Sequence, residues 1–335
     1  MGGRCGRASR GSIVVVACAS LVLSACGSGS AKPTGGKAAS TASTASTAVA
    51  TANVTMAIPA VTTAGAVLVA QQEGFFQKEH LAVSTQTIAN ITLLPAALLK
   101  GQYDISISTA TNLISARAAN LQLVAVAGNT VNTTASSTST VLVAKTSSGI
   151  TSLKDLSGKR IGVDAPTGNV NIAVEYKLKQ LGVTGAQYVT MAYPNMLAEL
   201  NAGQVDAVEA ALPYSAQFAG PAYKSLGAPF LFLPVPNLSA IWIASQSWAS
   251  AHVAVVARFR SALAMAGAFI LAHRSVFDDA VAKLTGLSPA SIATQALPVF
   301  VSNISPGDFQ PWLDAMNVIS GNKYSAVQVK ELVAP

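Results

Sequence analysis

The stretch ITSLKDLSGKRIGV, residues 150–163, decides the fold of this chain. Its last residues begin a strand-like run, Arg160–Asp164, and Lys159 and Arg160 place positive charge at the start of that run. A helical pattern follows at Asn169–Leu181, and a second strand-like run follows at Gln187–Met191. A helix between two strands is typical of a βαβ unit with parallel strands. The stretch therefore opens an α/β unit.

The same alternation continues on both sides of this stretch. The other strand-like runs are Asn53–Ile58, Leu81–Ile88, Tyr103–Ser108, Leu121–Ala127, Thr140–Lys145, Asp206–Ala210 and Ala240–Ala244. The other helical segments are Gly65–Glu73, Thr92–Lys100, Ala110–Asn120 and Met196–Ala202. The pattern predicts an α/β protein with two lobes around a cleft, each lobe a mixed, mainly parallel sheet flanked by helices. Ligands of such sheets bind beyond the carboxyl ends of the strands, close to helix N-termini.

The last part of the chain is mostly helical, and it contains one strongly apolar run, Val253–His273. This run is long enough to span a membrane. Arg258, Arg260 and His273 argue against a span, because unpaired charges are costly inside a bilayer. We expect a buried helix of a globular domain.

The first 25 residues have the pattern of an export signal. Arg4, Arg7 and Arg10 precede an apolar run, Ile13–Leu23, which is shorter than the about 20 residues that a spanning helix needs. Small residues then lead to Cys26 within Leu23–Gly27, as in a lipobox. We predict cleavage before Cys26, its lipidation, and an extracytoplasmic protein anchored to the outer face of the membrane. An ordinary secretory signal with a chance cysteine is the alternative.

Composition limits the remaining possibilities. Residues 26–52 repeat Gly, Ser, Thr and Ala and are predicted to form a disordered tether behind the lipidated cysteine. The three cysteines, Cys5, Cys18 and Cys26, leave the mature chain one thiol and no disulfide. The net charge of +7 is partly carried by the signal, and no basic run is interleaved with aromatic residues, so nucleic-acid binding is not expected.

Four segments together resemble one protein family. They are EGFFQKE (73–79), LKGQYDI (99–105), the opening stretch 150–163, and LNAGQVDA (200–207). In this order they look like the substrate-binding proteins of ABC importers for nitrate, sulfonates, taurine and thiamine-pyrimidine precursors. The resemblance covers about Asn53 to Ala244.

The resemblance implies a periplasmic-binding-protein-like fold of type II, with two hinge strands near Thr140–Lys145 and Ala240–Ser245. Residues 53–143 with 246–335 would form the first lobe, and residues 144–245 the second. It also implies closure around a small molecule, delivery to an ABC permease and its ATPase, and a monomer without a cofactor or a metal.

Candidate ligand-binding residues follow the predicted strands. Thr62 and Thr63, either of which could cap the next helix, follow the first strand, and Ser108 and Thr109 follow the third. The loop after Asp164 offers Thr167, Gly168, Asn169 and Asn171, where relatives place hydroxyl residues for an anionic group. Pro213 and Tyr214 follow the strand Asp206–Ala210.

The candidate loops also restrict the ligand. Relatives often carry an aromatic residue and an acid before the last proline, where this chain has Ala211 and Leu212. No arginine lies in the loops, so a bidentate anion clamp is absent from them and a bare anion such as nitrate is disfavoured. We expect a neutral or weakly charged organic ligand. Glu209 either is exposed or faces the cleft.

Two other functions remain open. Some pyrimidine-forming relatives are enzymes that use a histidine, but His80, His252 and His273 lie outside the candidate loops. No HExxH or Gly-x-Ser-x-Gly motif is present, so we predict that the protein is not an enzyme. A binding protein that reports to a sensor has the same sequence features as one that feeds a permease.

Overall fold

The structure is a computed structural model, and it describes residues 49–88, 91–135 and 139–334. The predicted signal peptide, the predicted lipidation site Cys26 and the predicted tether up to residue 48 lie outside the described residues. Ala52, predicted as the last residue of the tether, is the first residue of a strand.

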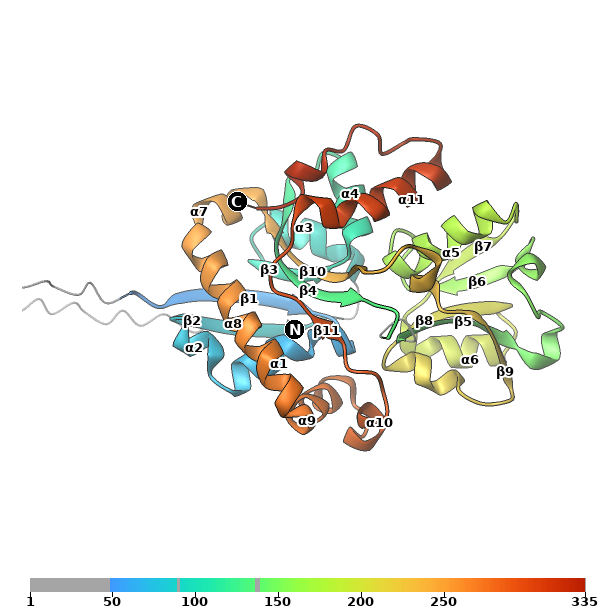
Figure 1. Cartoon of the computed structure of the whole chain (residues 1–335), viewed down its shortest axis with the longest axis horizontal. Helices are drawn as coiled ribbons and strands as arrows, with labels where there is room; N and C mark the ends of the chain where they lie inside the picture. Colours follow the sequence, from blue (N-terminus) through green and yellow to red (C-terminus); the bar gives the residue numbers. More distant parts are fainter. Residues whose placement is uncertain (1–48, 89–90, 136–138, 335) are drawn as a thin grey trace, which may run out of the picture. The chain divides into compact units, whose positions relative to one another are not determined.

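Eleven strands and eleven α-helices occur within the described residues (Figure 1). The strands are β1 (Ala52–Ile58), β2 (Leu81–Thr87), β3 (Ile105–Ser108), β4 (Leu123–Asn132), β5 (Thr140–Lys145), β6 (Arg160–Val163), β7 (Gln187–Thr190), β8 (Ala207–Ala211), β9 (Tyr223–Gly227), β10 (Asn237–Ser245) and β11 (Val299–Phe300). The helices are α1 (Gly65–Gln72), α2 (Phe75–Lys78), α3 (Leu94–Leu99), α4 (Ala110–Ala118), α5 (Asn169–Gln180), α6 (Met196–Asn201), α7 (Gln246–Ala251), α8 (Val253–Ala272), α9 (Arg274–Thr285), α10 (Pro289–Ala293) and α11 (Gln310–Ser320).

The strands form two sheets, which confirms the predicted fold class. The first has the order β11-β4-β10-β3-β1-β2, and the second has the order β7-β6-β8-β5-β9. In each sheet the strands joined by helices pair in parallel, namely β1 with β2 and β3, and β6 with β7 and β8. The returning strands β10 and β5 pair antiparallel with their neighbours, so both sheets are mixed.

Alternation along β10 explains why helices cover both faces of the first sheet. Trp242 and Ala244 pack into a core with α1, α2, α8 and α9, whereas Ile241 and Ile243 pack into a second core with α4 and α11. Successive side chains of a strand point to opposite faces, so an unbroken apolar run indicates burial on both sides. The sequence of β10 has this property.

Two matching turns align the parallel strands. Gly101 and Gly203 adopt φ values of +67° and +72°, a conformation that glycine accepts readily, and each precedes an aspartate by three residues. Asp104 accepts hydrogen bonds from the backbone N–H and hydroxyl of Thr55 on β1, at 2.7 and 2.8 Å. Asp206 accepts from the backbone N–H of Arg160 on β6 at 2.8 Å and also pairs with its guanidinium. The repeated Gly-Gln-x-Asp motif thus has the same structural role in both sheets.

The chain passes between the sheets at positions that differ from the predicted hinges. It leaves the first sheet after Asn132 and enters the second at Thr140, and it returns between Gly227 and Asn237. β5 pairs only within the second sheet and β10 only within the first, so neither is a crossover strand. The expected crossovers are therefore each displaced by a few residues, and the division into two moving lobes stays a prediction.

Helix α5 contributes to the cores of both sheets. Its Val174 and Leu178 pack on the second sheet, whereas Val170 and Ile172 belong to the core that contains α4 and α11 of the first. In Figure 1, α5 lies beside the strands of the second sheet and its neighbour α11 lies on the first. One side of the molecule is therefore joined by continuous apolar packing.

Helix α8, predicted as a buried helix, covers the first sheet with one face (Figure 1). By length and composition it could span a membrane. Within the fold, 39% of its most apolar 18-residue stretch is buried. Its buried residues include Val256, Phe259 and Ile270. Arg260 donates to the backbone oxygen of Val126 at 2.6 Å, so this charge is used within the fold.

Candidate functional site

A pocket of about 720 Å³ lies at the ends of strands from both sheets. The loop after β1, the start of α4 after β3, the loop between β6 and α5 and the segment after β8 all contribute to its wall. These are the four places that were predicted from the rule that ligands bind beyond the carboxyl ends of strands. A pocket thus lies at the predicted place, and its binding of a ligand stays a prediction.

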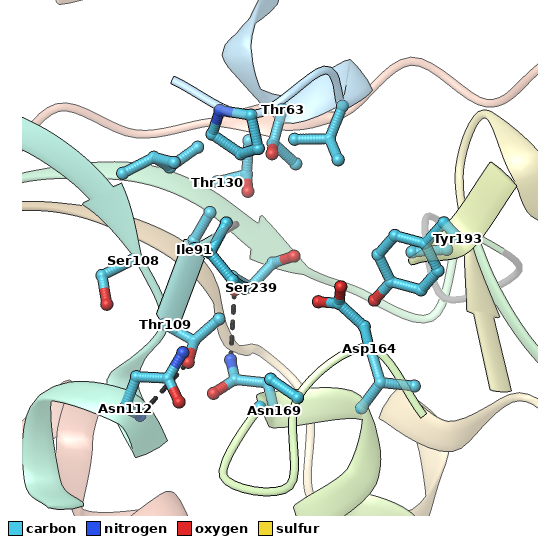
Figure 2. A pocket seen from close by; sticks show the side chains of 18 of the residues that line it. Thr63, Ile91, Ser108, Thr109, Asn112, Thr130, Asp164, Asn169, Tyr193 and Ser239 are labelled. Carbon is cyan, nitrogen blue, oxygen red and sulfur yellow. Dashed lines mark hydrogen bonds between the residues drawn. The ribbon is translucent and has the colours of Figure 1, made fainter. Parts of the chain in front are cut away.

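Most of the candidate residues line this pocket. They are Thr62, Thr63, Ser108, Thr109, Thr167, Gly168, Asn169 and Tyr214. Figure 2 shows Thr63, Ser108, Thr109 and Asn169 around the same space.

Asn171 and Pro213 do not line the pocket. Asn171 is fully buried, and its amide donates to the Pro166 backbone oxygen and to Glu175, both at 2.8 Å. It stands two residues after Asn169 on α5, and residues at this spacing do not share a face of a helix. Asn171 therefore holds the loop before α5 in place.

Thr62 and Thr63 do not cap the helix that they precede. They form a 3-10 turn, Thr62–Ala64, that continues directly into α1 without a capping side chain. The Thr62 side chain is buried and lines the pocket, and its hydroxyl has no hydrogen-bond partner in the described part of the chain. Its hydroxyl is therefore a buried polar group that is unsatisfied within the described residues.

The hydroxyls of Thr109 and Thr167 both form hydrogen bonds with Asn112 of α4. The Thr109 side chain caps α4 by accepting from the backbone N–H of Asn112 at 3.2 Å (Figure 2). The Thr167 hydroxyl, from the loop before α5, donates to the Asn112 side-chain oxygen at 2.7 Å. Both hydroxyls thus already contribute to structure, and the second joins elements of the two sheets.

Asn169 also joins the two sheets. Its Oδ1 accepts from the backbone N–H of Thr111 on α4 at 3.2 Å and lies 2.8 Å from the Thr111 hydroxyl. Its Nδ2 donates to the backbone oxygens of Leu238 and Ser239 on β10, at 2.8 and 3.1 Å (Figure 2). Both ends of the amide are thus engaged in contacts between elements of the two sheets, and the binding of a ligand by Asn169 stays a prediction.

Other polar residues line the pocket from the antiparallel strands. Thr130 on β4 and Thr140 on β5 are buried, and neither hydroxyl has a partner among the described residues. Ser239 on β10 contributes as well (Figure 2). Sequence reasoning missed them because it considered only loops after strands, and because β4 extends five residues beyond its predicted end at Ala127.

Two carboxyl groups reach the pocket from the second sheet. Asp164 follows β6 and faces the Tyr193 hydroxyl (Figure 2). Burial raises the pKa of Asp164 to about 6, although the hydrogen bond from Tyr193 lowers it. Glu209 on β8 lines the pocket, which decides between the two orientations left open by the sequence. Burial and then the Asp164 charge raise the pKa of Glu209 well above its usual range.

Aromatic and aliphatic side chains complete the wall. Tyr193 and Tyr214 stack with their ring centroids 6.2 Å apart. Aliphatic residues of the lining include Ile88, Ile107 and Leu297. Among the described residues of the lining none is a lysine, an arginine or a histidine, and no group of three or more His, Cys, Asp or Glu in the described ranges could hold a metal ion.

Two α/β sheets, joined by two connecting segments and enclosing a pocket at their strand ends, define a fold of the periplasmic-binding-protein class. The sequence pattern described as NMT1/THI5 like matches residues 61–275, and the chain belongs to this family. No curated protein sequence gives a match.

Solved structures of the same fold cover most of the chain. The alkanesulfonate-binding protein SsuA from Xanthomonas axonopodis pv. citri, bound to MOPS, is 20% identical with a TM-score of 0.69, over 86% of this chain and 98% of that one. The periplasmic nitrate-binding protein NrtA from Synechocystis PCC 6803 is 11% identical with a TM-score of 0.70, over 84% of each chain. At these identities the likeness establishes the fold.

Proposed function

We propose that this protein captures a small organic solute in the pocket between its sheets and delivers it to an ABC importer. The observation that carries the proposal is the pocket itself, which falls within the ~300–1,000 Å³ typical of small-molecule sites. The residues Thr62, Thr130 and Thr140 line it, and their buried hydroxyls have no partner in the part of the chain that the structure describes. Unpaired buried polar groups are costly, and a ligand would satisfy them.

Family membership and the predicted location support the import role. SsuA and NrtA, which share the fold, are described as binding alkanesulfonates and nitrate. The lipobox at Leu23–Gly27 would keep the protein on the outer face of the membrane, beside a permease. A short flexible tether can raise the local concentration of a bound partner to about the millimolar range.

Ligand binding would close the pocket by movement of the second sheet about the two connections between the sheets. We place the hinges between Asn132 and Thr140 and between Gly227 and Asn237. Closure of this kind gains affinity from contacts that only the closed form makes.

No specific observation favours an enzyme. His80, His252 and His273 are absent from the pocket lining, and the rings of His252 and His273 stack on Trp248 and Phe269. A binding protein that reports to a sensor would use the same pocket and would differ only in its partner protein.

The proposal is tested by native mass spectrometry of the purified chain, followed by a thermal-shift screen with the compounds that co-purify. We expect a small organic molecule whose affinity drops in Thr62→Val and Thr130→Val, which remove only a hydroxyl. The exposed Thr184→Val is the matched control. Equal affinity in all three variants would reject the pocket as the binding site. Uptake that is unchanged when the gene is deleted would reject import.

A further inference from the structure

The charged residues of the described pocket lining are all of one sign. Asp164 and Glu209 are the charged residues of its described lining, and both are acids. A sulfonate or nitrate placed there would meet two carboxyl groups and no basic side chain. This arrangement is the opposite of an anion-binding site, for which arginine or lysine donors are typical.

Glu209 has an oxygen without a partner. Its side chain lies on β8 and is 1% exposed, and its Oε2 accepts no hydrogen bond within the described part of the chain. The ionisable groups that act on it are Asp164, Glu175, Tyr188 and Tyr193, none of which is cationic. A buried carboxyl oxygen that lines a pocket without a donor is an acceptor left for something that enters the pocket.

The surroundings of the two acids suit a cation. The stacked rings of Tyr193 and Tyr214 stand beside them, and aromatic faces attract cations. The hydroxyls of Thr130 on β4 and Thr140 on β5, which have no partner among the described residues, offer further acceptors. The rest of the lining is largely aliphatic, which fits an organic body.

We propose that the ligand carries a protonated amine or a similar nitrogen cation, which binds to Glu209 and Asp164 in the pocket. This inference rests on the proposed function and specifies the charge of the solute. The cation donates to the free oxygen of Glu209 and offsets the repulsion between the two carboxylates. An apolar body occupies the aliphatic part of the pocket.

The test uses matched probes on the full chain. Three scaffolds (phenylethyl, indolylethyl and cyclohexylethyl) are each measured by calorimetry as the amine, the alcohol and the sulfonate. We expect amines to bind about tenfold or more tightly than their alcohols, since a charge-assisted hydrogen bond gives such a factor. We also expect their affinity to rise between pH 5 and pH 7.5, because Asp164 and then Glu209 lose protons more readily when a cation is present.

Two variants separate the carboxylate from its surroundings. Glu209→Gln should lower amine affinity about tenfold or more and leave alcohol affinity nearly unchanged. Glu175→Gln is the matched control, because Glu175 is a nearby half-buried acid outside the pocket lining. Equal amine affinity in the two variants would overturn the inference.

A third variant distinguishes failure of the inference from failure of the proposed function. Ala211→Trp fills the pocket and should abolish binding of every probe. If sulfonates or alcohols bind most tightly and no longer bind to Ala211→Trp, the inference that the ligand is a cation is wrong. The proposal that the pocket binds a solute would still hold. If no probe binds and no molecule co-purifies, the proposed function falls and the inference falls with it.

Discussion

At the scale of single residues, Asp164 and Glu209 are carboxyl groups held where their charged forms are disfavoured. Burial is the main cause for both, and Glu209 is also exposed to the charges of Asp164 and Glu175. A group that is destabilised in the folded protein but needed by a ligand is typical of functional sites. In the ligand-free protein, the two buried carboxyl groups are therefore expected to lower the free energy of unfolding.

The first prediction concerns the pH dependence of stability. The pKa of Asp164 is about 6 in the folded protein against 3.8 for an ordinary aspartate. Its contribution to stability is present below pH 3.8 and is lost as the pH rises through 6. At about 1.4 kcal/mol per pH unit, the loss approaches about 3 kcal/mol. Urea unfolding of the ligand-free protein at pH 4, 5, 6 and 7 measures it.

Asp164→Asn should remove this part of the pH dependence and make the ligand-free protein more stable at pH 7. The exposed Asp279→Asn on α9 serves as the control and should keep the slope of the parent. An unchanged slope in Asp164→Asn would contradict the assignment. Burial also raises the pKa of Glu209, so Glu209 should add to the decline in both proteins.

At the scale of elements, the N-termini of α4 and α5 are fastened to each other. Asn169 and Thr167 at the start of α5 bond to Thr111 and Asn112 at the start of α4. The apolar residues Val170 and Ile172 continue the contact into the core shared with α11. Two helices from different sheets thus behave as one support for the pocket wall.

The second prediction tests this support. Asn169→Ala removes an amide that bonds to Thr111, Leu238 and Ser239, and it leaves buried backbone groups unpaired. We expect the free energy of unfolding to fall by about 2–3 kcal/mol. Denaturant unfolding measures the change. The exposed Asn195→Ala should change it by no more than about 0.5 kcal/mol, and a similar loss in both variants would refute the role of Asn169.

The third prediction concerns the contact between α1 and α9. Gly65 begins α1, and a Cβ atom there would overlap the Phe277 ring and come within 2.8 Å of Val281 Cγ2. Gly65→Ala should therefore destabilise the protein by about 1–3 kcal/mol through overpacking. Gly307→Ala is the control, because the nearest atom to its Cβ is 3.8 Å away. Equal melting temperatures of the two variants would contradict the packing argument.

At the scale of the whole molecule, the sequence predicts the periodic parts best. Every strand and helix named from the alternating pattern is present, because burial on one or both faces imposes that pattern on the residues. The edge strands β9 and β11 were not predicted, because β9 lacks an apolar run and β11 has only two residues, too few to form a pattern. The predicted crossovers differ by a few residues from those observed, because their positions depend on the sheet in which each strand pairs. The sequence of a single strand does not reveal its pairing partners.

The candidate site was predicted less completely, for the same reason. Thr62 and Thr167 stand in loops behind strands, so their sequence position alone points to the pocket. Thr130 faces it from within β4, where only the register with β10 decides the direction of a side chain. The partners of Asn169 are far away in sequence, so its structural role could not be read from the loop that holds it.

The fourth prediction separates the two possible membrane elements. Cys26→Ser should release the exported protein from the membrane, because the predicted lipid is its anchor and α8 is packed on the first sheet. Fractionation of cells that express each form measures this. The parent should sediment with membranes and the variant should be soluble. A variant that stays with the membranes would indicate that α8 or the uncleaved signal holds it there.

The packing of Trp312 makes its intrinsic fluorescence a probe of the pocket. Trp312 on α11 is fully buried and meets Phe230 edge-on, with ring centroids 6.1 Å apart. Phe230 lies on the returning connection between the sheets and lines the pocket. A ligand that displaces Phe230 would alter the surroundings of this indole, and the intrinsic fluorescence of the protein would change. Titrations could then be followed without attaching a dye.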